Sequence, residues 1–168
     1  MRVLLGTCEL PLDRLVDLRE CRKDLTIKDD SSWQSNNGRL EVGYSPTSTF
    51  GHDLLSDRED MKGRGLAFTV AIYSASYLPH DSCQNVQVEY CINVVGYAST
   101  YSTQSVSDGT EPYFGYSKIR QIDRVTSSVM EQLQSEVISF HVYADKSRDD
   151  RKQQNQKQSK KDEDCITF

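Results

Sequence analysis

Hydrophobic and polar residues alternate with a period of two along much of this chain. In the segment 86–94 every second residue is apolar, and the residues between are mostly polar. Successive side chains of a β-strand point to opposite faces of the sheet, so this pattern predicts a strand with one buried face. The residues expected on that face are Val86, Val88, Tyr90, Ile92 and Val94.

Several other segments carry the same signal. Three are clear, centred on Leu40-Val42-Tyr44, Phe68-Val70-Ile72 and Ile138-Phe140-Val142. Four are less regular and span residues 2–10, 25–28, 97–104 and 113–122. In the last of these the alternation slips by one position near Lys118, which indicates a β-bulge. Together the segments predict about eight strands.

One segment changes to helical periodicity. Between residues 125 and 136, Ser128 and Glu131 have the spacing of a capping box, with Val129, Met130 and Leu133 on one side. We expect one short helix there, covering an end of the β-structure. Residues 11–15 are also suited to a single helical turn, because proline is favoured at the first helical position.

The chain has 168 residues, which is typical of one domain. Residues 46–65 lack sustained periodicity and are interpreted as a linker between two strand-rich parts, 1–45 and 66–145. Residues 146–168 are almost entirely polar or charged, so we expect a disordered tail. The predicted fold class is mainly β, an antiparallel sandwich.

Composition narrows the function classes. Five cysteines, an odd number without regular spacing, argue against a disulfide framework, and His80 with Cys83 lacks the second half of a zinc site. The net charge of -5 disfavours nucleic acid as a partner. No stretch approaches the roughly 18 apolar residues of a membrane-spanning helix. We therefore expect a cytoplasmic chain.

Two parts of the chain resemble the two ends of a C2 domain. Residues 5–12 (LGTCELPL), 25–29 (LTIKD) and 38–42 (GRLEV) resemble its closing strands, and residues 68–79 (FTVAIYSASYLP) resemble its opening strand. This likeness implies a C2-type antiparallel β-sandwich with its strands in rotated order. We expect the two parts to close around residues 46–65, because separate halves would leave their apolar faces exposed.

The middle of the chain is similar to a more specific group. The C2-like region of kinesin-3 proteins is resembled by segments 111–116, 119–122, 129–133 and 137–144. Tandem-C2 centriolar and ciliary proteins are the alternative, because they too have the closing strand of one C2 unit followed by the opening strand of the next. No GxxxxGK[ST] phosphate loop is present, so the chain holds no motor. The resemblance implies a noncatalytic protein-interaction or scaffolding module, a fragment of a cytoskeleton-associated, kinesin-like microtubule protein, with a protein partner.

Calcium binding is a property that the C2 resemblance raises. The matching loops offer Asp81 in the first and Asp145, Asp149 and Asp150 in the second. Calcium takes six to eight oxygen ligands, and these carboxylates would supply only part of that shell. Basic residues also lie among the second-loop acids. We favour solvated loop charge as their role and predict no cofactor.

A basic run gives the alternative function, a peripheral membrane module that binds anionic phospholipid. Lys118, Arg120 and Arg124 lie where some C2 domains carry a lipid-binding cluster, and the first two share a strand face. Each would contribute about 1 kcal/mol near an anionic surface, against the net negative charge of the chain. An ordinary solvated strand face is the competing interpretation, and we favour it.

The sequence shows no obvious set of catalytic residues. The three histidines, His52, His80 and His141, lie in a predicted linker, a loop and an outward strand face, and no GxSxG motif occurs. Trp33, in a polar turn, is interpreted as a surface cover or an interface anchor. We therefore predict no catalytic residues, no enzyme activity and no small-molecule substrate.

Overall fold

The structure is a computed structural model that describes residues 1–29, 38–47, 61–79, 84–94, 98–107 and 109–145. Eight strands and two helices lie in these ranges: β1 (Arg2–Pro11), α1 (Asp13–Val16), β2 (Cys21–Thr26), β3 (Arg39–Thr47), β4 (Leu66–Ser76), β5 (Gln84–Ile92), β6 (Ser99–Ser102), β7 (Tyr113–Ile122), α2 (Ser127–Ser135) and β8 (Val137–Asp145). The predicted disordered tail, 146–168, lies outside the described residues.

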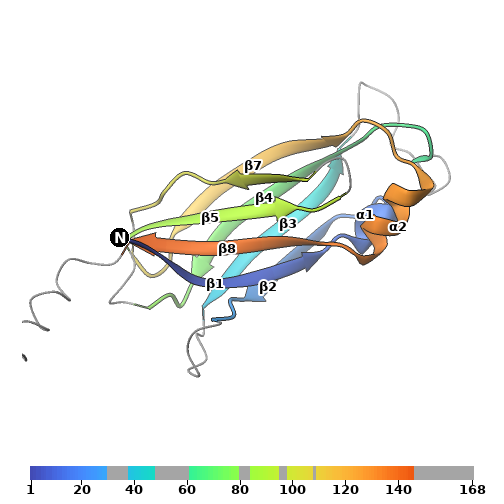
Figure 1. Ribbon diagram of the computed structural model, residues 1–168. Coiled ribbons are helices and arrows are strands. Elements are labelled where there is room, and N and C mark those ends of the chain that lie inside the picture. The colour runs from blue at the N-terminus through green and yellow to red at the C-terminus, as the bar shows by residue number, and fades with distance from the viewer. Residues whose placement is uncertain (30–37, 48–60, 80–83, 95–97, 108, 146–168) are drawn as a thin grey trace, which may run out of the picture.

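The strands form two antiparallel four-stranded sheets. Sheet A has the order β1-β8-β5-β6, and sheet B has the order β2-β3-β4-β7. Figure 1 shows the sheets as two layers, with α1 and α2 together at one end and the N-terminus at the other. The prediction of a mainly β, antiparallel sandwich is confirmed.

The N-terminal and C-terminal parts of the chain close into one sandwich. In sheet A, β1 pairs with β8, so that Leu10 lies opposite Ile138. In sheet B, β3 pairs with β4, which places the two ends of the predicted linker, 46–65, beside each other. β3 extends to Thr47 and Met61 is buried in the core, so both parts reach into that linker.

One continuous core fills the space between the sheets. All five residues expected on the buried face of segment 86–94 are at most 5% exposed, so that prediction is confirmed. The clear alternating segments are buried in the same way. They contribute Leu40, Val42, Tyr44, Phe68, Val70, Ile72, Ile138, Phe140 and Val142.

The bulge in β7 lies elsewhere than predicted. The β4–β7 register shifts between Ile72, opposite Tyr116, and Ser74, opposite Tyr113. Two residues of β7 therefore oppose one of β4, and one of the two is Gly115 with a φ of +54°. Glycine adopts this conformation without steric penalty, whereas the expected position, Lys118, pairs regularly with Val70.

Helix α2 begins at a different cap from the one predicted. Thr126 is the N-cap, and its Oγ1 accepts a hydrogen bond of 3.2 Å from the Val129 amide. Ser128, the expected capping residue, is inside the helix. Val129, Met130 and Leu133 are buried, as expected. The predicted turn after Pro11 is α1, so the described chain has two helices rather than one.

The start of β2 was missed. We expected a strand over residues 25–28, but β2 begins at Cys21, which pairs with Tyr44. Lys23 lies opposite buried Val42, although its own side chain is exposed at the sheet edge. The alternation of apolar and polar residues is lost where a charged residue occupies an inner position of an edge strand. Such charged residues commonly protect an edge strand from pairing with another chain.

Candidate functional site

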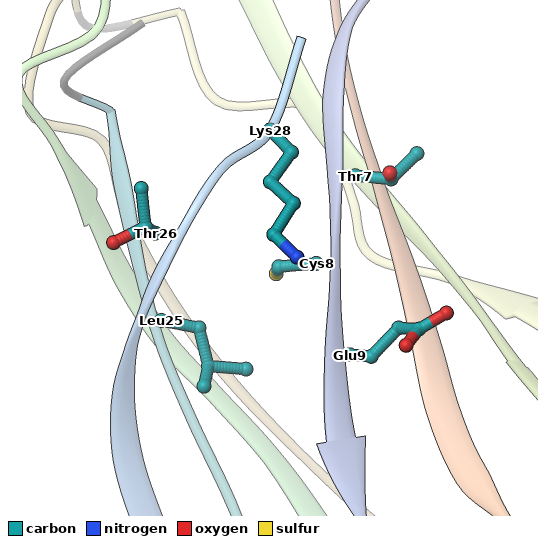
Figure 2. A pocket seen from close by; sticks show the side chains of 6 residues that line it. All are labelled: Thr7, Cys8, Glu9, Leu25, Thr26 and Lys28. Atoms are coloured by element: carbon teal, nitrogen blue, oxygen red, sulfur yellow. The ribbon is translucent and has the colours of Figure 1, made fainter. Parts of the chain in front are cut away.

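A cleft opens along one flank of the sandwich, where the edge strand of each sheet lies beside the other. β1 is an edge of sheet A and β2 is an edge of sheet B. The cleft between them has a volume of about 570 Å³. It is lined by Thr7, Cys8, Glu9, Leu25, Thr26 and Lys28. Figure 2 shows the two strands diverging on either side of this space.

The cleft is bounded by contacts between the two sheets. Thr7 and Lys28 exchange two backbone hydrogen bonds, of 2.9 Å and 2.8 Å. Further along β1, the Tyr44 hydroxyl of β3 donates a hydrogen bond of 2.8 Å to the carbonyl oxygen of Pro11. Between Thr7 and Pro11, the described residues of β1 and β2 show no further backbone hydrogen bond to each other. The strands are therefore held near Thr7 and Pro11 and open between them.

Backbone groups of both strands point into this opening. The Leu12 amide donates to the carbonyl of Glu136, which continues the ladder between β1 and β8. Every second residue of β1 before it, Leu10 and Cys8, therefore directs its backbone groups toward β8. Backbone groups of neighbouring residues alternate between the two sides of a strand. The amide and carbonyl of Glu9 therefore face β2, as those of Thr7 do.

The same alternation applies to β2. The amide of Ile27 donates to the carbonyl of Gly38, next to β3, so Ile27 and every second residue before it direct their backbone groups toward β3. The residues between these direct theirs away from β3. Arg22, Asp24 and Thr26 thus present their backbone groups at the free edge of sheet B. Edge groups of this kind can pair with another extended chain.

Side chains divide into two sets around the opening. Figure 2 shows Cys8, Leu25 and Lys28 in the space between the strands, whereas Thr7, Glu9 and Thr26 point away from it. Cys8 is 4% exposed and Leu25 is half-buried, so they form an apolar floor that continues into the core. Lys28 is exposed and brings a positive charge to this floor.

The chemistry of Cys8 is set by its burial. Removal from water raises the pKa of its thiol to about 12, and the negative charge of Glu9 acts in the same direction. Because the thiolate is the nucleophilic form, a thiol with this pKa is unreactive near neutral pH. Cys8, Cys21 and Cys91 are free thiols in the described part of the chain.

The predicted calcium residues are only partly described. Asp145 ends β8, and its Oδ2 accepts a hydrogen bond of 3.0 Å from the Asn85 side-chain amide. Asp81, Asp149 and Asp150 lie outside the described residues. Within the described ranges, no three acidic, histidine or cysteine side chains gather as a metal site would require. Solvated loop charge, the role that we favoured for these aspartates, and calcium binding, the alternative, both stay untested.

The predicted basic run is spread over different environments. Lys118 and Arg120 do share a face of β7, opposite Val70 and Phe68, and this is the inner face at the edge of sheet B. Lys118 is exposed there. Arg124 is exposed beyond the end of β7.

Arg120 is engaged by tyrosines of both sheets. Its Nε donates 2.9 Å to the Tyr90 hydroxyl, and its Nη2 donates 2.9 Å to the Tyr116 hydroxyl. The guanidinium lies 3.4 Å from the ring centroid of Tyr101. Arg120 thus ties β7 of sheet B to β5 and β6 of sheet A.

Of the remaining predicted candidates, the structure describes His141. It lies on the outer face of β8, stacked on Tyr143 and opposite Glu89 of β5. His52, His80, Cys83 and Trp33 lie outside the described residues.

Sequence reasoning missed the cleft, although one residue marks its closed end. A Cβ atom at Gly6, whose φ is +157°, would lie 2.5 Å from the carbonyl oxygen of Lys28. A glycine inside a strand pattern signals such a close backbone approach. Which segment approaches, however, depends on the pairing of strands distant in sequence.

The fold and cleft define a class of structure, a β-sandwich with an open flank between edge strands of different sheets. No protein-family model matches the chain, and no curated protein sequence does. No helix in the described ranges is long and apolar enough to span a bilayer.

Proposed function

We propose that the chain is a noncatalytic, C2-like protein-interaction module, of the kind expected in a cytoskeleton-associated protein. The observation that carries the proposal is the cleft of about 570 Å³, with unpaired edges of two sheets facing it. Backbone donors and acceptors at a sheet edge are suited to bind another polypeptide. The proposed rotated strand order requires the two parts of the chain to close into one sandwich, and β1 pairs with β8 and β3 with β4.

The residues of the cleft favour binding over catalysis. Its thiol, Cys8, holds its proton at neutral pH because burial raises its pKa to about 12. The carboxylate of Glu9 points away from the space into which Lys28 extends. A catalytic site would require a nucleophile and a base within hydrogen-bond reach of each other.

Binding to an anionic membrane is the second candidate function, favoured by the exposed side chain of Lys118 on β7. Lys118 is exposed, and the neighbouring Ile119 is 63% exposed. The Lys118 ammonium group suits an anionic phospholipid surface, whereas Ile119, the next residue of the strand, points to the opposite face. The observation is weaker than the cleft, because Arg120 is already bound by tyrosines.

Two measurements on the full chain decide between these functions. Selection from a displayed peptide library should enrich a related set of sequences that bind the folded chain. Sedimentation with phosphatidylcholine–phosphatidylserine vesicles should leave the chain in the supernatant, both with calcium and with EGTA. Vesicle binding that Lys118→Ala abolishes, together with a library that enriches no sequence, would overturn the proposal in favour of the membrane module.

A further inference from the structure

We propose that β2 accepts an extended peptide as a fifth strand of sheet B, and that this peptide carries an apolar residue with acidic residues two positions before and after it. The inference rests on the proposed protein-interaction function and specifies its site and ligand. It follows from the backbone, the floor and the charges of the cleft.

The free edge of β2 is accessible to a new strand. Arg22, Asp24 and Thr26 direct their backbone groups away from β3, as the pairing of Ile27 with Gly38 requires. Two of the side chains are held on the outer face of sheet B. Arg22 forms an ion pair of 2.8 Å with Glu41, and Asp24 forms one of 2.9 Å with Arg39. These side chains therefore leave the edge open.

β2 is a better template than β1. Between the bonds made by Thr7 and by Pro11, Glu9 is the one β1 residue whose backbone faces the cleft. β2 offers three such residues in a strand of six. A strand added to β2 can thus form a regular ladder, and Glu9 on the opposite side can add to it.

The floor of the cleft selects an apolar side chain. Residues of an added strand alternate between the two faces of the sheet, so one set points inward beside Leu25. Leu25 and Cys8 line the cleft beside this inward position. Cys8 belongs to the core, and Leu25 packs against it. An inward apolar side chain of the peptide would therefore continue the core into the cleft.

Two lysines flank this position. Lys23 shares the inner face of β2 with Leu25 and is exposed. On the other side, the Lys28 side chain extends into the cleft beside Cys8 (Figure 2). The three ion pairs among described residues use Arg2, Arg22 and Arg39, and neither lysine. Carboxylates two positions from the apolar residue would meet these two ammonium groups.

The direct test uses fluorescence anisotropy with a labelled peptide that contains Glu-Thr-Leu-Thr-Glu. We expect saturable binding to the full chain, with affinity lowered at least about tenfold when Glu is replaced by Lys in the peptide. The double substitution Lys23→Glu and Lys28→Glu should reverse this preference. Lys118→Glu, the same change on the opposite flank, should leave it unaltered.

Backbone pairing has its own signature. N-methylation of the peptide removes one amide donor at a time, and an added strand has alternate amides directed at β2. Methylation at alternate positions should lower affinity at least about tenfold, and methylation at the positions between should have a smaller effect. Thr26→Pro, which removes an edge donor of β2, should weaken binding while the circular dichroism spectrum keeps its β-sheet form.

Failure of this inference differs from failure of the proposed function. If library-selected peptides bind but are insensitive to Lys23→Glu, Lys28→Glu and Thr26→Pro, the site is elsewhere and the inference is wrong, while the interaction module stands. If no peptide binds and the chain sediments with anionic vesicles, both are wrong.

Discussion

Thr7 and Lys28 join the edge strands of two different sheets through a pair of backbone hydrogen bonds, 2.9 Å and 2.8 Å long. This bridge closes one end of the cleft between β1 and β2. An interrupted edge of this kind combines two requirements of a peptide-binding site, a rigid frame and unpaired backbone groups.

Gly6 makes the bridge sterically possible, so its substitution should destabilise the fold. In Gly6→Ala the new Cβ would meet the Lys28 carbonyl oxygen at 2.5 Å and the Ile27 Cγ2 at 2.6 Å. Backbone must shift to relieve this overlap, and we expect the free energy of unfolding to fall by about 1–3 kcal/mol. Urea denaturation followed by circular dichroism measures the change.

The matched control is Gly109→Asn. Gly109 also has a positive φ, +47°, but a Cβ there would meet no atom within 4 Å. Asparagine tolerates this backbone region, so the change should stay within about 0.5 kcal/mol. Equal losses in the two variants would show that the contact at Lys28 is not the cause.

Arg120 should stabilise the sandwich more than its neighbour Lys118 on the same strand face. Arg120→Met removes the donors to the hydroxyls of Tyr90 and Tyr116 and the contact with Tyr101. Because Tyr90 is fully buried, we expect a loss of about 1–3 kcal/mol in the free energy of unfolding. Lys118→Met should change it by less than about 0.5 kcal/mol. Urea titrations of both variants test this, and a loss for Lys118→Met as large as that for Arg120→Met would contradict it.

The buried thiol of Cys8 should make stability depend on pH in the alkaline range. Burial raises its pKa from the ordinary 9.0 to about 12, so the folded state keeps a proton that the unfolded state releases. The contribution is complete below pH 9 and is lost as the pH rises from 9 toward 12. The free energy of unfolding should fall by about 1.4 kcal/mol per pH unit within that window.

Measurements between pH 9 and 10 isolate this thiol best. Burial also raises the pKa of the Tyr44 and Tyr90 phenols, but from an ordinary value of 10.0. Cys8→Ala should flatten the pH dependence in this interval. Leu10→Val trims the same buried face of β1 without an ionisable group, so its loss of stability should be the same at each pH. A Cys8→Ala curve parallel to wild type would refute the assignment.

The sequence allowed the buried faces to be predicted because alternation is a local property. Val86, Val88 and Tyr90 carry it without interruption, and the structure buries all three. The position of a bulge and the environment of a cation are not local. The bulge at Gly115 and the inward face of Arg120 both depend on how β7 pairs with β4. The acceptor Tyr90 of Arg120 lies on the other sheet.

The cleft was unpredictable for the same reason. It depends on β1 and β2 being edges on one flank, which is a property of the sheet order. The local signals at hand were Gly6 and the charged start of β2, and neither identifies its partner strand. The two loops weighed for calcium stay untested, because Asp81, Asp149 and Asp150 lie outside the described residues.

The start of α2 offers a final prediction, because two neighbouring hydroxyl residues have different roles there. Thr126 Oγ1 accepts from the Val129 amide at 3.2 Å, so Thr126→Ala leaves a helix-terminal donor without its partner. We expect a loss of about 1 kcal/mol in the free energy of unfolding, since α2 buries Val129 and Leu133 against the sandwich end. Ser128→Ala, inside the helix, should be neutral or slightly stabilising, because alanine has the higher helix propensity. Thermal and urea unfolding of the two variants distinguish these positions, and a larger loss for Ser128→Ala would restore the capping box inferred from the sequence.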